Sequence, residues 1–134
     1  MTNGRKFVER EIRDIMTDTN YPDYYHHLQS LTSRLAKENP GTMSGFAQMR
    51  RQTMTEGALS TKMKELIALG MAITSRCDGC IAYHVHDAMR AGATRQEISE
   101  TIGVAITMGG GPALIYGAEA LEAVGQFENT GRKV

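Results

Sequence analysis

The two cysteines of this chain, and the histidine that follows them, are the residues best suited to chemistry. Cys77 and Cys80 are three residues apart, and His84 follows four residues later. Side chains at these spacings share one stripe of an α-helix, so Cys77 should meet Cys80, and Cys80 should meet His84. The thiolate is the nucleophile in thiol–disulfide exchange, and both a CxxC motif and a helix N-terminus favour it. The pattern therefore predicts a redox-active dithiol with a base beside it.

Two other interpretations of these three residues remain open. Free cysteines can act as small buried hydrophobic residues, with a histidine satisfied nearby. A structural zinc site is the other alternative, but such a site needs four ligands and a CxxC pair is normally completed by a second ligand pair. The chain has only two cysteines, and its other histidines are His26, His27 and His86. We therefore expect neither a metal nor a cofactor at the CxxC motif.

Glu65 is the second candidate for chemistry. In a helix its neighbours toward the C-terminus would be Ala68, Leu69, Ala72 and Ile73. A carboxylate on an apolar face is costly to bury without a partner, and its proton affinity rises if it stays unpaired. One interpretation is an exposed acid of a first helical turn, beside two lysines. The functional interpretation is a proton relay to His84 on an adjacent helix.

Helical patterns must position these residues, because no segment of the chain alternates as a strand would. Apolar stripes predict a first helix around Phe7 to Met16 and a second that follows Asp23 as its N-cap. A third helix is expected over about residues 42–55, with Phe46 pointing inward. A fourth, over about residues 61–74, is apolar nearly all round and should be buried. The fold class predicted is all-α.

Capping signals mark the ends of several of these helices. Ser60 is the expected N-cap of the fourth helix, and Ser75 that of the CxxC helix, which should end before Gly92. Thr94 and Glu97 have the spacing of a capping box. Pro112 suits the first turn of a last helix that follows a run of glycines.

Composition limits the possible classes of protein. The chain has 134 residues, 41% of them apolar, and 15 basic residues balance 15 acidic ones. This balance provides no basic field for nucleic acid. The N-terminus is charged rather than apolar, so we expect no secretory signal. The longest uncharged run, residues 101–118, is too short and too rich in glycine to cross a membrane. We expect a cytoplasmic protein with neither a nucleic-acid nor a membrane partner.

Three short segments together resemble a known family. They are Lys64-Glu65-Leu66-Ile67-Ala68-Leu69, Cys77-x-x-Cys80-x-x-x-His84 and Gly92-Ala93-Thr94-x-x-Glu97-Ile98. The combination is similar to the carboxymuconolactone decarboxylase family, and most of all to its alkylhydroperoxidase (AhpD-like) branch, from about residue 42 to residue 124. The resemblance implies an AhpD-like helical bundle that forms homo-oligomers, commonly trimers or hexamers.

The resemblance also implies a chemistry. Cys77 and Cys80 would be the redox pair, His84 the base beside Cys80, and Glu65 the relay carboxylate. The activity implied is a thiol-dependent peroxidase or disulfide reductase that acts on a peroxide or a small disulfide. Its reductant would be a dithiol, such as a lipoylated or thioredoxin-like protein. The best-known alkylhydroperoxidases have a further histidine between the two cysteines, where this chain has Gly79.

The alternative is a decarboxylase-like or other non-redox lactone enzyme on the same fold. The decarboxylase branch lacks the cysteine pair, which disfavours lactone chemistry here. For domain organisation, we expect N-terminal helices over residues 1–41 that pack on or between subunits. The AhpD-like CxxC core would cover residues 42–127, and a polar tail residues 128–134.

Overall fold

The computed structural model describes residues 3–8 and 19–131, and within these residues every regular element is a helix. A short helical segment covers residues 3–8. The others are α2 (Tyr21–Glu38), α3 (Pro40–Met54), α4 (Thr61–Thr74), α5 (Asp78–Arg90), α6 (Arg95–Gly109) and α7 (Gly111–Gly131). The predicted all-α class is confirmed. Most of the expected first helix lies outside the described residues.

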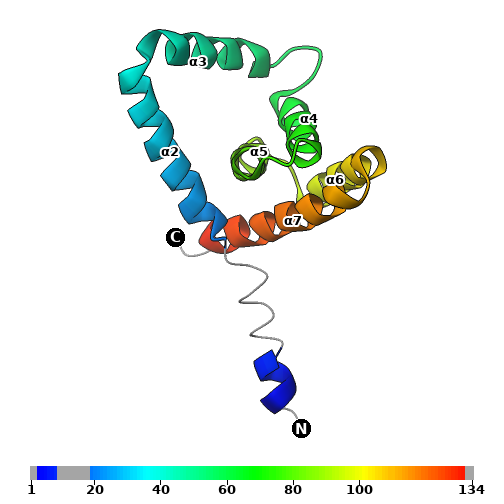
Figure 1. Cartoon of the computed structure of the whole chain (residues 1–134). Helices are drawn as coiled ribbons and strands as arrows, with labels where there is room; N and C mark the ends of the chain where they lie inside the picture. The colour runs from blue at the N-terminus through cyan, green and yellow to red at the C-terminus, as the bar shows by residue number, and fades with distance from the viewer. Residues whose placement is uncertain (1–2, 9–18, 132–134) are drawn as a thin grey trace.

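The core is formed where α4, α5, α6 and α7 pack together. Its largest fully buried side chains are Leu69, Ile73, Ile81, Val85, Ile98 and Val124. Burying a side chain of this size contributes about 1.5–3 kcal/mol. Because α4 and α5 each supply two of them, these two helices are held firmly against each other. Figure 1 shows α5 near the centre of the molecule, surrounded by α2, α4 and α7.

The predicted burial of α4 on nearly all sides is wrong. Leu66, Leu69 and Ile73 face the core, but Ile67 and Met71 on the same helix are exposed. A helix contacts its neighbours only along the stripe that faces them. The apolar residues on the far side of α4 therefore remain uncovered in a single chain.

Helices α2 and α3 form two sides of a frame around α5 (Figure 1). Tyr21 and Tyr25 anchor α2 in the core, whereas α3 has no buried residue. Phe46, predicted to point inward, is 58% exposed. The physical reason is that α3 contacts its neighbours mainly toward its two ends, where it leaves α2 and where it approaches α4 (Figure 1).

The N-terminus of α2 differs from the prediction by three residues. The N-cap is Asn20, whose side chain accepts a hydrogen bond from the backbone N–H of Asp23 at 3.0 Å. Asp23 therefore lies in the first turn rather than before it. Proline is tolerated in the first turn because its missing N–H would be unpaired there, and Pro22 occupies that position.

Polar contacts hold the end of α3 against the start of α4. The Lys64 ammonium donates to the backbone carbonyls of Thr53 and Thr55, at 2.8 and 2.6 Å. The Thr61 hydroxyl donates to the carbonyl of Met54 at 2.8 Å. A lysine near a helix C-terminus satisfies carbonyls that have no partner within the helix. These bonds place the last turn of α3 beside α4.

The predicted caps of α4 and α6 are present. The Ser60 side chain caps α4, and Thr94 and Glu97 form a reciprocal capping box at the start of α6. Gly92 has a φ of 95°, a value that glycine adopts readily, where the chain leaves α5. In the described part of the chain, no helix is both long and apolar enough to cross a membrane.

Candidate active site

The turn between α4 and α5 places the first cysteine at a helix N-terminus. Ser75 ends α4, and Arg76 follows with a φ of 57°, in the left-handed region. Cys77 is then the N-cap of α5, and its sulfur accepts a hydrogen bond from the Cys80 N–H at 3.2 Å. The prediction that Ser75 caps this helix is wrong. Ser75 belongs to the end of the preceding helix, so α5 begins two residues later than a Ser75 cap would require.

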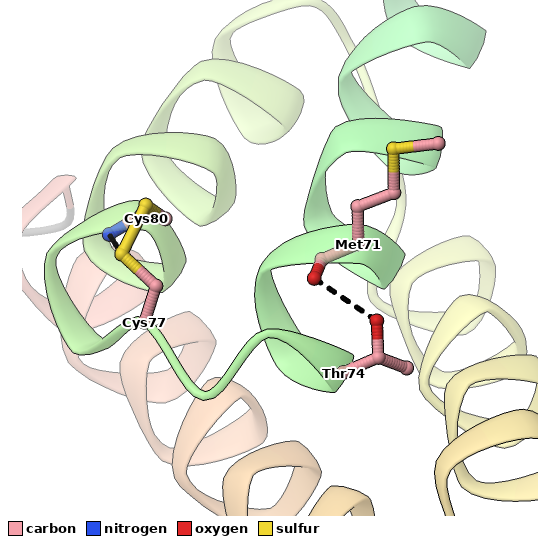
Figure 2. Close-up of a disulfide and its surroundings, with 4 residues drawn as sticks. All are labelled: Met71, Thr74, Cys77 and Cys80. Atoms are coloured by element: carbon pink, nitrogen blue, oxygen red, sulfur yellow. Dashed lines mark hydrogen bonds between the residues drawn. A yellow bond between two sulfur atoms is a disulfide. The ribbon is translucent and has the colours of Figure 1, made fainter.

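Cys77 and Cys80 form a disulfide, and both residues are partly buried. Their Cα atoms are 5.2 Å apart, within the range in which a disulfide closes without backbone movement. Figure 2 shows the bond at the first turn of α5, with Met71 and Thr74 on the neighbouring end of α4. The pair can therefore change between dithiol and disulfide while the helix stays in place.

Glu65 and His84 form a hydrogen-bonded pair between α4 and α5. Glu65 is 4% exposed and is the one buried charged residue in the described part of the chain. Its Oε2 lies 2.8 Å from Nδ1 of His84, which is itself partly buried. The structure thus brings together two predicted residues that are 19 positions apart in the sequence.

This hydrogen bond selects the tautomer of His84. An ionised carboxylate only accepts hydrogen bonds, so Nδ1 of His84 must carry the proton and donate it to Glu65. In a neutral imidazole the other nitrogen, Nε2, is then an acceptor. His84 is one helical turn beyond Cys80, on the same stripe of α5. The pair can therefore present a proton acceptor toward the Cys80 side of the helix.

The same site contains Arg50 and Asp87, which sequence reasoning missed. The Arg50 guanidinium forms an ion pair with Asp87 and lies 3.7 Å from Oε1 of Glu65. Asp87 is three residues after His84 on α5, a helical spacing that could have indicated it. For Arg50 the sequence holds little signal, because its partners lie on two other helices.

His86 belongs to an aromatic cluster near the site. It stacks on Tyr25 with ring centroids 4.0 Å apart, and its Nδ1 lies 2.9 Å from Oδ1 of Asp87. Tyr83 and Phe127 pack edge-on against Tyr25. Within residues 3–8 and 19–131, no three histidine, cysteine or acidic side chains are grouped so as to hold a metal ion.

Gly79, between the two cysteines, lies close to side chains of α2. A Cβ atom at this position would be 3.2 Å from a methyl carbon of Leu28 and 3.6 Å from the Tyr24 hydroxyl. A larger side chain between the two cysteines would therefore collide with α2 unless Leu28 moved. The close approach of this helix is a physical reason for glycine at position 79.

An open cleft of about 400 Å³ lies beside the start of α5. It is lined by Thr19, Asn20, Asp23, Tyr24, His27 and Asp78. Nearby, partial burial and the negative charge of Asp78 raise the pKa of the Glu119 carboxyl. The cysteine-bearing turn therefore has an acidic surrounding on the side that faces α2 and α7.

Comparison with known proteins agrees with this architecture. The sequence model of the carboxymuconolactone decarboxylase family matches residues 40–123. An uncharacterized protein of Cupriavidus necator is 37% identical over 87 residues, which are 65% of this chain and 77% of that protein. A crystal structure of a carboxymuconolactone decarboxylase family protein from Legionella pneumophila aligns with a TM-score of 0.77 at 40% identity. That alignment covers 80% of this chain and 96% of the other.

A further structure shares the fold alone. A carboxymuconolactone decarboxylase family protein of Thermotoga maritima, for which a role in the antioxidative response has been suggested, aligns with a TM-score of 0.74 at 22% identity. The alignment covers 83% of this chain and 94% of that one. This chain belongs to the carboxymuconolactone decarboxylase family.

Proposed function

We propose that the protein is a thiol-dependent peroxidase or disulfide reductase of the AhpD-like branch of its family. The observation that carries the proposal is the disulfide between Cys77 and Cys80, one helical turn from His84 and its hydrogen bond to the buried Glu65. A structural disulfide would need no base beside it. A helix N-terminus and a histidine are instead the features that stabilise a reactive thiolate.

The reaction begins with both cysteines reduced. His84 takes the Cys80 proton at Nε2, while Glu65 accepts the hydrogen bond from Nδ1 and stabilises the imidazolium. The Cys80 thiolate attacks one peroxide oxygen and the O–O bond breaks. The departing oxygen takes the proton from His84 and leaves as an alcohol or water, so Cys80 becomes a sulfenic acid.

The disulfide then forms within the same turn. The Cys77 sulfur attacks the Cys80 sulfur and displaces hydroxide, which leaves as water with the Cys77 proton. An external dithiol, such as a lipoylated or thioredoxin-like protein, reduces the disulfide by two exchange steps and is itself oxidised. We place this cycle in the cytoplasm, where a cysteine pair serves catalysis more often than structure.

The surroundings of the two sulfurs favour Cys80 as the first nucleophile. Cys80 has His84 one turn away on its own helix. Cys77 lies at the N-cap, directly before the acidic Asp78. A negative charge beside a thiol disfavours its ionisation, whereas a base within reach promotes it.

Peroxide oxidation tests the proposal directly. Reduced protein treated with an equivalent of hydrogen peroxide should lose both free thiols, because the two sulfurs close on each other. The oxidised chain should remain a monomer on a non-reducing denaturing gel and have the mass expected for the loss of two hydrogens. Disulfide-linked dimers alone would contradict the proposed redox pair. Retained thiols in a protein that turns over a lactone would favour the non-redox alternative.

We also propose that the protein is a homo-oligomer. The described part of the chain exposes many large apolar side chains on α4, α6 and α7: Met63, Ile67, Met71, Val104, Met108, Leu114 and Ile115. Apolar surface on this scale is typical of protein contacts. Size-exclusion chromatography with light scattering should give a trimer or a hexamer, and a monomer at micromolar concentration would contradict this proposal.

A further inference from the structure

Arg50 joins two acidic residues that come from different helices. Its guanidinium forms an ion pair with Asp87 on α5 and lies 3.7 Å from Oε1 of Glu65 on α4. Oε2 of Glu65 is the atom that accepts from His84. Oε1 of Glu65 thus lies near the Arg50 guanidinium, and Oε2 accepts the hydrogen bond from His84.

A buried carboxylate needs such a partner. Glu65 is the one buried charged residue among those described, and an unpaired charge in this position would be strongly unfavourable. The cationic side chains within ion-pairing distance of Glu65 in the described residues are Arg50 and His84. His84 is charged only when protonated, so Arg50 is the permanent positive charge.

The other cations of α4 are engaged elsewhere. Lys62 forms an ion pair with Glu97 on α6 at 2.9 Å. Lys64 donates to the carbonyls at the end of α3. Neither is therefore placed to substitute for Arg50 beside Glu65.

Asp87 determines where the Arg50 side chain lies. The Arg50 side chain is 44% exposed, and α3 has no buried residue to hold it. An arginine with this freedom would not stay beside Glu65 without a second contact. Asp87 provides that contact and is itself hydrogen-bonded to His86, whose ring is stacked on Tyr25.

We propose that Arg50, held by Asp87, is a positioning residue. It orients the Glu65 carboxylate and favours its ionised form, which accepts the hydrogen bond from His84. This inference rests on the proposed function, and it adds Arg50 and Asp87 to the residues on which the proposed proton relay depends. It also makes the relay depend on α3, since the guanidinium reaches the site from that helix. The polar partners of Arg50 in the described residues are Glu65 and Asp87, so its effect on the thiols should pass through Glu65 and His84.

The test uses the full-length reduced protein and four variants: Arg50→Gln, Arg50→Lys, Asp87→Asn and, as a matched control, Arg95→Gln. Arg95 forms an exposed ion pair with Glu128, outside the site. Two quantities are measured: the pH profile of the iodoacetamide alkylation rate, and the NMR signals of the His84 imidazole. Circular dichroism establishes that each variant is folded.

We expect Arg50→Gln to lower the alkylation rate at neutral pH by about tenfold, as the loss of a charged hydrogen-bonding partner would. The midpoint of its pH profile should move upward, and the His84 signals should shift. Arg50→Lys should restore part of the rate, Asp87→Asn should resemble Arg50→Gln in weaker form, and Arg95→Gln should match the parent.

A parental pH profile and parental His84 signals in Arg50→Gln would overturn the inference. If that variant does not fold, Arg50→Lys and Asp87→Asn decide, since parental values in both would also overturn it. This failure is distinguishable from failure of the proposed function. In the latter case, the unmodified protein itself would show no activated thiol, and Glu65→Gln would not change its profile.

Discussion

Cys80→Ser should abolish peroxide-dependent oxidation of the protein, because serine cannot form the sulfenic acid on which the cycle depends. Cys77→Ser should behave differently. Its Cys80 should still react once with peroxide, but no neighbouring thiol would be present to close the disulfide. We therefore expect a persistent sulfenic acid, trapped by dimedone and detected by mass spectrometry.

The Cys77 replacement is a favourable one for the fold. Cys77 is the N-cap of α5 and its sulfur accepts from the Cys80 N–H. Serine is among the preferred N-cap residues, so Cys77→Ser should keep the helix and remove only the resolving thiol. Its thermal melting should stay close to that of the reduced parent. The opposite result would reverse the proposed order of the two cysteines. In that case dimedone would label Cys77 in the Cys80→Ser variant, and it would not label Cys80 in the Cys77→Ser variant.

The second large effect concerns the proton relay. His84→Gln and Glu65→Gln should each slow peroxide-dependent oxidation at neutral pH, and a general base typically contributes about 10²- to 10⁴-fold. Raising the pH should recover part of the rate, because the thiol then ionises without help. Stopped-flow measurement of thiol loss across a pH series tests both statements.

The double variant separates a relay from two independent contributions. Both residues act on the same proton, so their effects should be strongly non-additive, and the double variant should be little slower than the poorer single one. Glu128→Gln is a suitable control, since its carboxylate forms an exposed ion pair with Arg95, outside the site. A parental rate in Glu65→Gln alone would limit the relay to His84, and parental rates in both single variants would contradict catalysis by this site.

Local sequence signals were sufficient to predict the helices from α2 to α7 and several of the residues at which they begin. The caps at Ser60 and at Thr94 with Glu97 appear where they were predicted. Such caps depend on side chains within three residues of the backbone groups they satisfy. The predicted start of α5 is wrong because the sequence alone does not distinguish a serine that begins one helix from a serine that ends the helix before it. The three-dimensional path of the chain shows that Ser75 ends α4.

The sequence by itself determined that Cys80 and His84 share one stripe of a helix, because helical periodicity is a local property. It also placed Cys77 beside Cys80, although Cys77 is the N-cap of α5 and not part of its first turn as predicted. It also singled out Glu65 as an acid on an apolar face. Only the tertiary structure decided that Glu65 meets His84, that Arg50 and Asp87 join them, and that α2 covers Gly79. These contacts join separate helices, and their geometry follows from how the apolar faces pack rather than from any spacing along the chain.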